Sequence, residues 1–93
     1  MRKTNYRRSV LKDIKKFDKN AKELFLSEIE DLTQDLSIGK PLKGSLKGYY
    51  SRAFISGGIS YRIIYSYDDI KSIISVEMVG SRENIYKIFK KRI

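Results

Sequence analysis

Apolar residues in the first third of the chain recur at helical spacing and predict two consecutive helices. In the first helix, from Ser9 onward, the recurring positions are Val10, Leu11, Ile14 and Phe17. In the second helix they are Ala21, Phe25, Ile29, Leu32 and Leu36. Asn20, followed three residues later by Glu23, resembles a capping box and predicts the start of the second helix. Because only residues 18–20 separate the two patterns, we expect a helical hairpin with one shared apolar seam.

The pattern changes after the second helix. Residues 38–48 read IGKPLKGSLKG, and their glycines and proline predict a loop. YYSRAFI and ISYRIIYSY then flank the turn residues SGG and predict a β-hairpin. Alternation across residues 70–79 predicts a third strand of the same meander, which Gly80 and Ser81 end. A short C-terminal helix is predicted by the spacing of Ile85, Ile88 and Phe89.

The order of these elements predicts an α+β fold. Residues 2–7 are polar and extended in pattern, so we expect an N-terminal strand there. The helical hairpin then packs on an antiparallel sheet of about four strands, and a short C-terminal helix closes the chain. At 93 residues the chain can build one modest core, so residues 1–93 are expected to form a single domain. This arrangement leaves one face of the sheet for function.

Composition narrows the chemistry that the chain can perform. It contains neither cysteine nor histidine, which excludes disulfides, thiolate nucleophiles, an imidazole base and the usual zinc ligand sets. We therefore expect no metal and no cofactor. The formal net charge is +9, so we expect a negatively charged partner, although a basic surface also serves solubility. No stretch reaches membrane-spanning length and no signal-peptide core follows the basic N-terminus, so we expect a cytoplasmic protein that does not engage a membrane.

Two arginines lie in the predicted hairpin. Arg62 is in an otherwise apolar strand, where a charge is costly unless it faces solvent or a paired anion. A two-residue turn at Gly57 and Gly58 would place Arg52 and Arg62 on opposite faces, whereas a three-residue turn over residues 56–58 would pair them directly. We favour the three-residue turn, which would bring two guanidinium groups together around an anion.

Two further residues follow the last predicted strand. If residues 82–86 are helical, Arg82 and Tyr86 share one helical face, because they are four residues apart. On pattern alone, an ordinary basic turn followed by a packed tyrosine is an equally natural interpretation.

Three segments after a helical hairpin carry a resemblance to a known family: LKGSLKGYYSRAF, SYRIIYSYDD and VGSRENIYK. In this order they resemble the RelE/ParE superfamily of toxins from toxin-antitoxin systems, over nearly the whole chain. The stretch GYYSR is also similar to YoeB-like members, which belong to the RNA-cleaving side of the superfamily. The resemblance implies a ribosome-dependent endoribonuclease (an mRNA interferase) that cuts messenger RNA in the A site, with a cognate antitoxin as partner. It also implies that Arg62 binds the scissile phosphate and that Arg82 and Tyr86 belong to the active site.

RNA cleavage without a metal needs proton carriers as well as cations. The 2′-hydroxyl must lose a proton, the phosphorane's charge must be stabilised, and the leaving 5′-oxygen must gain a proton. Arginine supplies charge but is a poor proton carrier, so the candidates are Tyr86 and the loop residues Lys43 and Lys47. These lysines and Arg52 are also candidate RNA contacts. Tyrosines among the cations can stack on bases, and the candidates are Tyr49, Tyr50 and Tyr61.

The sequence departs from the YoeB-like pattern at three places. The C-terminal His-Tyr ending is missing, Lys40 stands where those proteins have a glutamate, and the chain between Tyr50 and Arg62 is longer than in typical members. The proton-transfer arrangement therefore stays open. Two alternatives also remain: a ParE-like toxin that binds DNA gyrase and cleaves nothing, and a degenerate member that binds only an antitoxin or nucleic acid.

Overall fold

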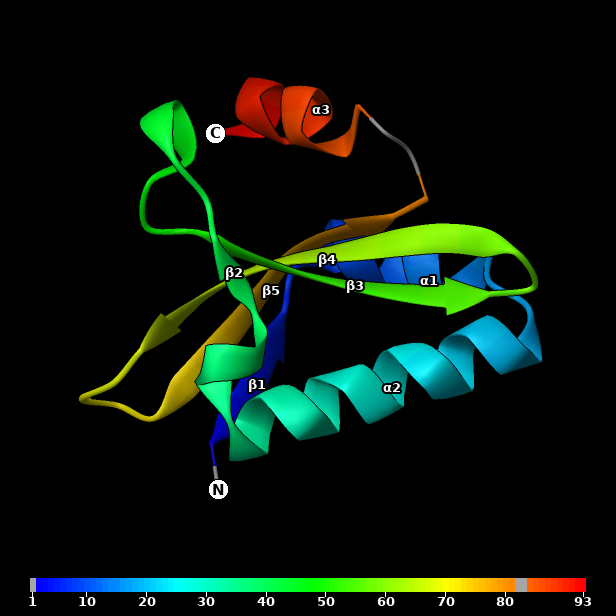
Figure 1. Ribbon diagram of the computed structural model, residues 1–93, viewed down its shortest axis with the longest axis horizontal. Coiled ribbons are helices and arrows are strands. Elements are labelled where there is room, and N and C mark those ends of the chain that lie inside the picture. Colours follow the sequence, from blue (N-terminus) through cyan, green and yellow to red (C-terminus); the bar gives the residue numbers. More distant parts are fainter. Residues whose placement is uncertain (1, 82–83) are drawn as a thin grey trace.

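The computed structural model of the chain describes residues 2–81 and 84–93 (Figure 1). Its elements are, in order, β1 (Lys3–Tyr6), α1 (Arg8–Lys15), α2 (Lys19–Gln34), the 3-10 turn η1 (Leu36–Ile38), β2 (Lys40–Pro41), the 3-10 turn η2 (Gly44–Leu46), β3 (Tyr50–Ser56), β4 (Ile59–Asp68), β5 (Ile73–Gly80) and α3 (Ile85–Arg92). The α+β fold predicted from the sequence is therefore confirmed. Within the described residues, no helix has the length and apolar character needed to cross a membrane.

The sheet is mixed rather than wholly antiparallel. Its described strands are in the order β1-β5-β4-β3-β2, so there are five where about four were expected. The meander β3–β4–β5 is antiparallel as predicted, whereas β1 lies parallel to β5, with Lys3 opposite Ile73 and Tyr6 opposite Val76. Periodicity could not reveal this neighbour, because the choice of sheet edge for β1 depends on contacts some 70 residues apart along the chain.

One face of the sheet is covered by α1 and α2, and it carries the larger core cluster. Val10 from α1 and Phe25 from α2 are fully buried there against strand residues such as Ile63 and Val76. Aromatic contacts link the layers: the ring of Phe25 lies 6.5 Å from that of Phe54, which stacks on Tyr61 at 5.0 Å. Both helices thus contribute buried residues to one apolar cluster against the sheet.

The start of α2 differs from the sequence prediction. Its N-cap is Asp18, whose carboxylate accepts a hydrogen bond from the Ala21 amide over 2.8 Å. Asn20 lies within the helix and donates from Nδ2 to Ser56 Oγ on β3 over 2.8 Å. The predicted capping box at Asn20 is therefore wrong, since an aspartate two residues earlier is an equally good cap and lies where the chain is still extended.

We call the other side of the sheet the open face; β3 presents Ser51, Ala53 and Ile55 there, and β4 presents Ser60, Arg62, Ile64 and Ser66. Figure 1 shows α3 on the opposite side of the sheet from α2, beside the loop that contains η2. A smaller cluster lies beneath them, formed by Leu46, Ile64, Met78, Ile85 and Phe89. A β-bulge at Ile64/Tyr65 shifts the register of β5, so that Met78 reaches this cluster while Val76 stays on the helix-covered face. α3 and the loop therefore cover only part of the open face.

Candidate active site on the open face of the sheet

Arg62 is on the open face near the end of the β4–β5 pairing. It lies opposite Ala53 on β3 and opposite Gly80 on β5, and its side chain is partly exposed. Neither of the salt bridges formed among the described residues involves it. The residues opposite Arg62 on both neighbouring strands are therefore small, and the Ile85 side chain lies near Gly80.

Tyr86, on the second residue of α3, reaches the same face. Its hydroxyl donates a hydrogen bond to Ser51 Oγ over 3.2 Å, and Ser51 is buried. Ser51 precedes Ala53 by two residues, so it is the diagonal neighbour of Arg62 across the strand pair. Diagonal neighbours have Cα atoms about 7–8 Å apart, within reach of long side chains. The structure thus brings together two of the three residues that the sequence proposed as catalytic.

Arg82, the third of these residues, lies outside the described residues. The chain enters that stretch from Ser81, next to the Gly80 that pairs with Arg62, and leaves it at Asn84, which precedes α3. The predicted helical spacing of Arg82 and Tyr86 is therefore not tested, since α3 is described from Ile85 onward.

Lys43 and Lys47 are exposed on the loop between β2 and β3, at the two ends of η2. The loop is held against α3 by Leu46, which is buried beside Phe89, and by Tyr49, whose ring meets that of Phe89 edge-on at 4.9 Å. The amide of Leu42 also donates to the Tyr49 carbonyl over 2.9 Å. The two lysines are thus placed on the α3 side of the molecule, and Tyr49 is packed beneath them.

Arg52 lies on the face opposite Arg62, and the predicted three-residue turn is wrong. Ser56 pairs with Ile59, so the turn contains only Gly57 and Gly58, both with positive φ, as a two-residue turn with the right twist requires. Arg52 Nε binds Glu28 Oε2 on α2 over 2.9 Å, and Nη1 donates to the Ile38 carbonyl over 3.1 Å. This arginine therefore ties β3 to the helical layer and does not join Arg62.

Tyr50 and Tyr61 are also packed on the helix-covered side. Tyr61 is buried between Phe54 and Phe17. Tyr50 stacks on Tyr65 at 5.6 Å and accepts a hydrogen bond from the Tyr67 hydroxyl over 3.2 Å. That bond and partial burial raise the pKa of Tyr67, and burial raises the pKa of Tyr65 to about 12. These tyrosines form a packed cluster, so they are not positioned as base-stacking residues on the open face.

The structure adds residues that the sequence analysis did not single out, namely Ser51, Ala53 and Ile55. They alternate along β3 and share the open face with Arg62. Their alternation was visible in the sequence, but its phase relative to Arg62 depended on the turn length. Further along this face Glu77 accepts from Ser66 Oγ over 3.0 Å and binds Arg7 Nε at 2.6 Å. The Glu77 carboxylate is therefore already paired, some three residues along β5 from the position opposite Arg62.

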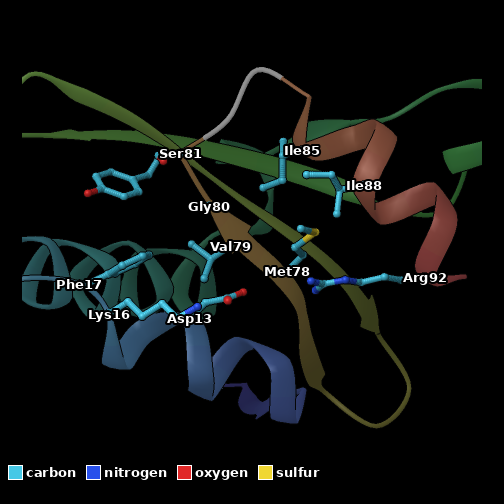
Figure 2. A pocket seen from close by; sticks show the side chains of 11 residues that line it. Asp13, Lys16, Phe17, Met78, Val79, Gly80, Ser81, Ile85, Ile88 and Arg92 are labelled. Carbon is cyan, nitrogen blue, oxygen red and sulfur yellow. The ribbon is translucent and has the colours of Figure 1, made fainter.

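A pocket of about 390 Å³ lies between α1, the end of β5 and α3 (Figure 2). Apolar side chains such as Val79, Ile85 and Ile88 line it, and Asp13, Lys16 and Arg92 bring charges to it. None of the described candidate catalytic residues lines this pocket. In the portion of the chain that the structure describes, there is also no group of three or more histidine, cysteine, aspartate or glutamate side chains able to hold a metal ion.

Comparisons with known proteins agree with this architecture. Residues 5–90 match the profile of a family described as ParE-like toxin of type II bacterial toxin-antitoxin system. A free Escherichia coli RelE toxin with two arginines replaced by alanine is 23% identical over 99% of this chain and 97% of its own, with a TM-score of 0.79. A chain of a RelBE toxin-antitoxin complex from Mycobacterium tuberculosis is 24% identical over 87% of this chain and 98% of its own, with a TM-score of 0.73. No curated protein matches.

Proposed function

Because the chain belongs to the ParE-like toxins of type II bacterial toxin-antitoxin systems, within the RelE/ParE superfamily, we propose that it is a ribosome-dependent endoribonuclease. In this proposal it cuts messenger RNA in the ribosomal A site and thereby inhibits translation. The observation that carries the proposal is the placement of Arg62 and Tyr86 on the open face, with the Tyr86 hydroxyl hydrogen-bonded to Ser51 beside Arg62. Catalysis would use both groups, Arg62 for charge stabilisation and Tyr86 for proton transfer.

The proposed reaction is a transesterification within the RNA strand. The 2′-oxygen attacks the adjacent phosphorus, the bond from phosphorus to the 5′-oxygen breaks, and the products end in a 2′,3′-cyclic phosphate and a 5′-hydroxyl. Arg62 binds the phosphate and stabilises the additional negative charge of the phosphorane, because a fixed guanidinium carries two parallel N–H donors toward its oxygens. The partly exposed side chain of Arg62 supports this role.

Two proton transfers are needed: a base takes one proton from the 2′-hydroxyl, and an acid gives one proton to the leaving 5′-oxygen. Tyr86 is the candidate for one transfer, since its hydroxyl lies on the face of Arg62 and is held there by Ser51. On the described open face, the carboxylate of Glu77 is already bound by Arg7 and Ser66. The second transfer therefore falls to Lys43, Lys47 or a group of the ribosome, which accounts for a dependence on the ribosome.

We also propose a cognate antitoxin as partner. Two of the similar folds were determined as toxin-antitoxin complexes, from Mycobacterium tuberculosis and Escherichia coli. The charge of +9 favours an acidic antitoxin segment. α3 has only eight residues and two buried side chains, Ile85 and Phe89. Little packing energy would therefore be lost if an apolar segment of a partner displaced this helix.

The test is translation of a defined message in a purified system, with message ends mapped by primer extension. Wild type is expected to produce cuts in the A site only when ribosomes are present. Arg62→Ala and Arg82→Ala should each lower the cleavage rate by about 100-fold or more, as removal of a charge-stabilising donor does in other enzymes. Tyr86→Phe should lower the rate by about 100-fold as well, through loss of proton transfer.

Lys71→Ala is the matched control for loss of one positive charge. Lys71 is exposed in the turn between β4 and β5, about six residues of strand away from Arg62. It should cut like wild type. If messages stay intact with wild type while DNA gyrase loses supercoiling activity in a parallel reaction, a ParE-like gyrase binder replaces the proposal, and inactivity in both reactions would favour a degenerate binder.

A further inference from the structure

The β3–β4 hairpin extends beyond the rest of the sheet. β5 last pairs with β4 where Gly80 lies opposite Arg62, whereas β3 and β4 continue pairing as far as Ser56 and Ile59. The hairpin tip therefore has two strands only, and it begins next to Arg62. On its open face it presents Ala53, Ile55 and Ser60.

Of the two exposed isoleucines at this tip, Ile55 and Ile59, only Ile55 lies on the open face. Ile55 is 69% exposed, and its neighbours on the open face are the small residues Ala53, two positions earlier, and Ser60 across the strand pair. The Ile55 side chain therefore extends beyond the small side chains around it. By the same register Ile55 is a diagonal neighbour of Arg62, on the side opposite Ser51 and Tyr86.

The tip is held in place from its other face. Phe54 is buried against Phe25 of α2, and Ser56 Oγ accepts a hydrogen bond from Asn20 Nδ2 at the start of α2. Gly57 and Gly58, at φ of 58° and 76°, close the hairpin with the shortest common turn. Because the backbone of the tip is held by these contacts, the Ile55 side chain can press against a ligand without moving.

We propose that Ile55 is a wedge that inserts beside the base next to the scissile phosphate and unstacks it from its neighbour. Cleavage by the 2′-oxygen needs that oxygen in line with the departing 5′-oxygen, and a stacked RNA strand does not present this alignment. Apolar side chains, isoleucine among them, are used by nucleic-acid-binding proteins to separate stacked bases, at a cost of a few kcal/mol per step. Arg62 holds the phosphate while Ile55, one diagonal away, turns the base aside.

This inference rests on the proposed function, because it assigns the RNA strand to the face that carries Arg62. Ile55 is a positioning residue in this scheme and transfers no proton. Without Ile55, the free energy needed to unstack the base would add to the barrier of the chemical step. Removing the Ile55 side chain should therefore lower the rate constant of cleavage and leave binding by the cations unchanged.

The first measurement is unstacking, which does not require cleavage. Ribosomes are programmed with a message that carries 2-aminopurine beside the cut site and a 2′-deoxy sugar at it, so that no 2′-oxygen is available. Wild type should raise 2-aminopurine fluorescence, since this base brightens when it unstacks. Ile55→Ala should bind the complex within about twofold of wild type but lose the rise. An equal rise with Ile55→Ala would overturn the proposal.

The second measurement is the rate of cleavage at saturating protein on the all-ribose message. Ile55→Ala should cut about tenfold more slowly or worse, which corresponds to 1.4 kcal/mol or more, and Ile55→Leu should restore most of the rate. Ile70→Ala is the matched control, because Ile70 is 97% exposed in the distant β4–β5 turn. Thermal unfolding should show both alanine variants folded, since neither removes a buried side chain.

The two proposals fail in different ways. If Ile55→Ala cuts at the wild-type rate while Arg62→Ala does not cut, the wedge is refuted and the nuclease stands. If wild type cuts nothing yet raises the 2-aminopurine signal through Ile55, the nuclease is refuted and the contact between Ile55 and the base stands. If wild type changes neither signal nor message, both are refuted.

Discussion

The two faces of the sheet differ in how fully their side chains are packed. Among the described residues, the helix-covered face packs twelve buried residues from two helices and three strands into one cluster, and both Arg52 and Tyr50 contact neighbours there. On the open face, among the described residues, a cluster of five buried apolar residues comes from the strands, α3 and the η2 loop, and beyond it Arg62 is partly exposed and Ile55 exposed. One face of the sheet is thus well packed, whereas on the other face Arg62 has no ion pair, and Ile55 is largely exposed, among the residues that the structure describes.

The comparison is tested most severely by matched truncations of one phenylalanine on each face. Phe25→Ala should lower the free energy of unfolding by about 3–5 kcal/mol, because it removes a fully buried ring from the larger cluster. Phe89→Ala removes an equally buried ring, but from beneath an eight-residue helix that can detach alone. Urea unfolding should therefore show a smaller loss for Phe89→Ala, while hydrogen exchange shows lost protection confined to α3. Equal global losses would mean that α3 belongs to the main cooperative unit.

A second prediction concerns the edge of the helix-covered face, where Gly39 meets Tyr65. The backbone of Gly39 has φ of −86°, which any residue adopts, so the glycine is required by space. A Cβ on it would overlap the Tyr65 hydroxyl and crowd the ring. Gly39→Ala should destabilise the fold by about 1–3 kcal/mol, as overpacking does. Combining it with Tyr65→Phe should cost less than the sum of the two single changes; additive losses would contradict the contact.

A third prediction uses pH to weaken the helix-covered face. Burial raises the pKa of Tyr65 from about 10 to about 12 in the folded chain, so the unfolded state loses this proton first. The contribution is fully present below pH 10 and is lost as pH rises toward 12, with a slope of up to about 1.4 kcal/mol per pH unit. Tyr65→Phe should flatten this decline without abolishing it, because the pKa of Tyr6 and of Tyr67 is raised as well. Chemical unfolding between pH 9 and 11.5 measures the slope.

The smallest effect on stability is expected from the two arginines of the hairpin. Arg52→Ala breaks a partly exposed ion pair with Glu28 and should cost about 1 kcal/mol or less, with RNA cleavage unchanged. Arg62→Ala should leave the midpoint of unfolding nearly unchanged while cleavage is lost. Measuring cleavage by the two variants together tests whether an arginine contributes because of the sheet face it lies on or merely because it is an arginine. Loss of cleavage in Arg52→Ala would place RNA on both faces.

Much of the fold was predictable because it is local. Helical spacing gave α1, α2 and α3 to within a few residues, and alternation gave the β3–β4–β5 meander. The parallel neighbour of β1 was not predictable, since no local pattern specifies which sheet edge a short strand joins. The two-residue strand β2 was not predictable either, because the sequence around residues 40 and 41 is typical of a glycine-rich loop.

Residues of the candidate site were predictable only where their identification did not depend on the register between two strands. Arg62 and Tyr86 were identified from the pattern and the family resemblance, and the structure places them on one face. The position of Arg52 failed because two common turns fit SGG equally well, and a change of one turn residue moves every later side chain to the other face. Ile55 was missed for the same reason, as its relation to Arg62 depends on that register.

The pairing of β1 with β5 affects the order in which the parts of this protein can fold during synthesis. β1 is synthesised first, yet its only strand neighbour among the described residues, β5, is made about 70 residues later. During synthesis the helical hairpin can form early, while the sheet stays incomplete until the last strand has left the ribosome. The open face is therefore complete only after β5 and α3, the last described elements, have been made.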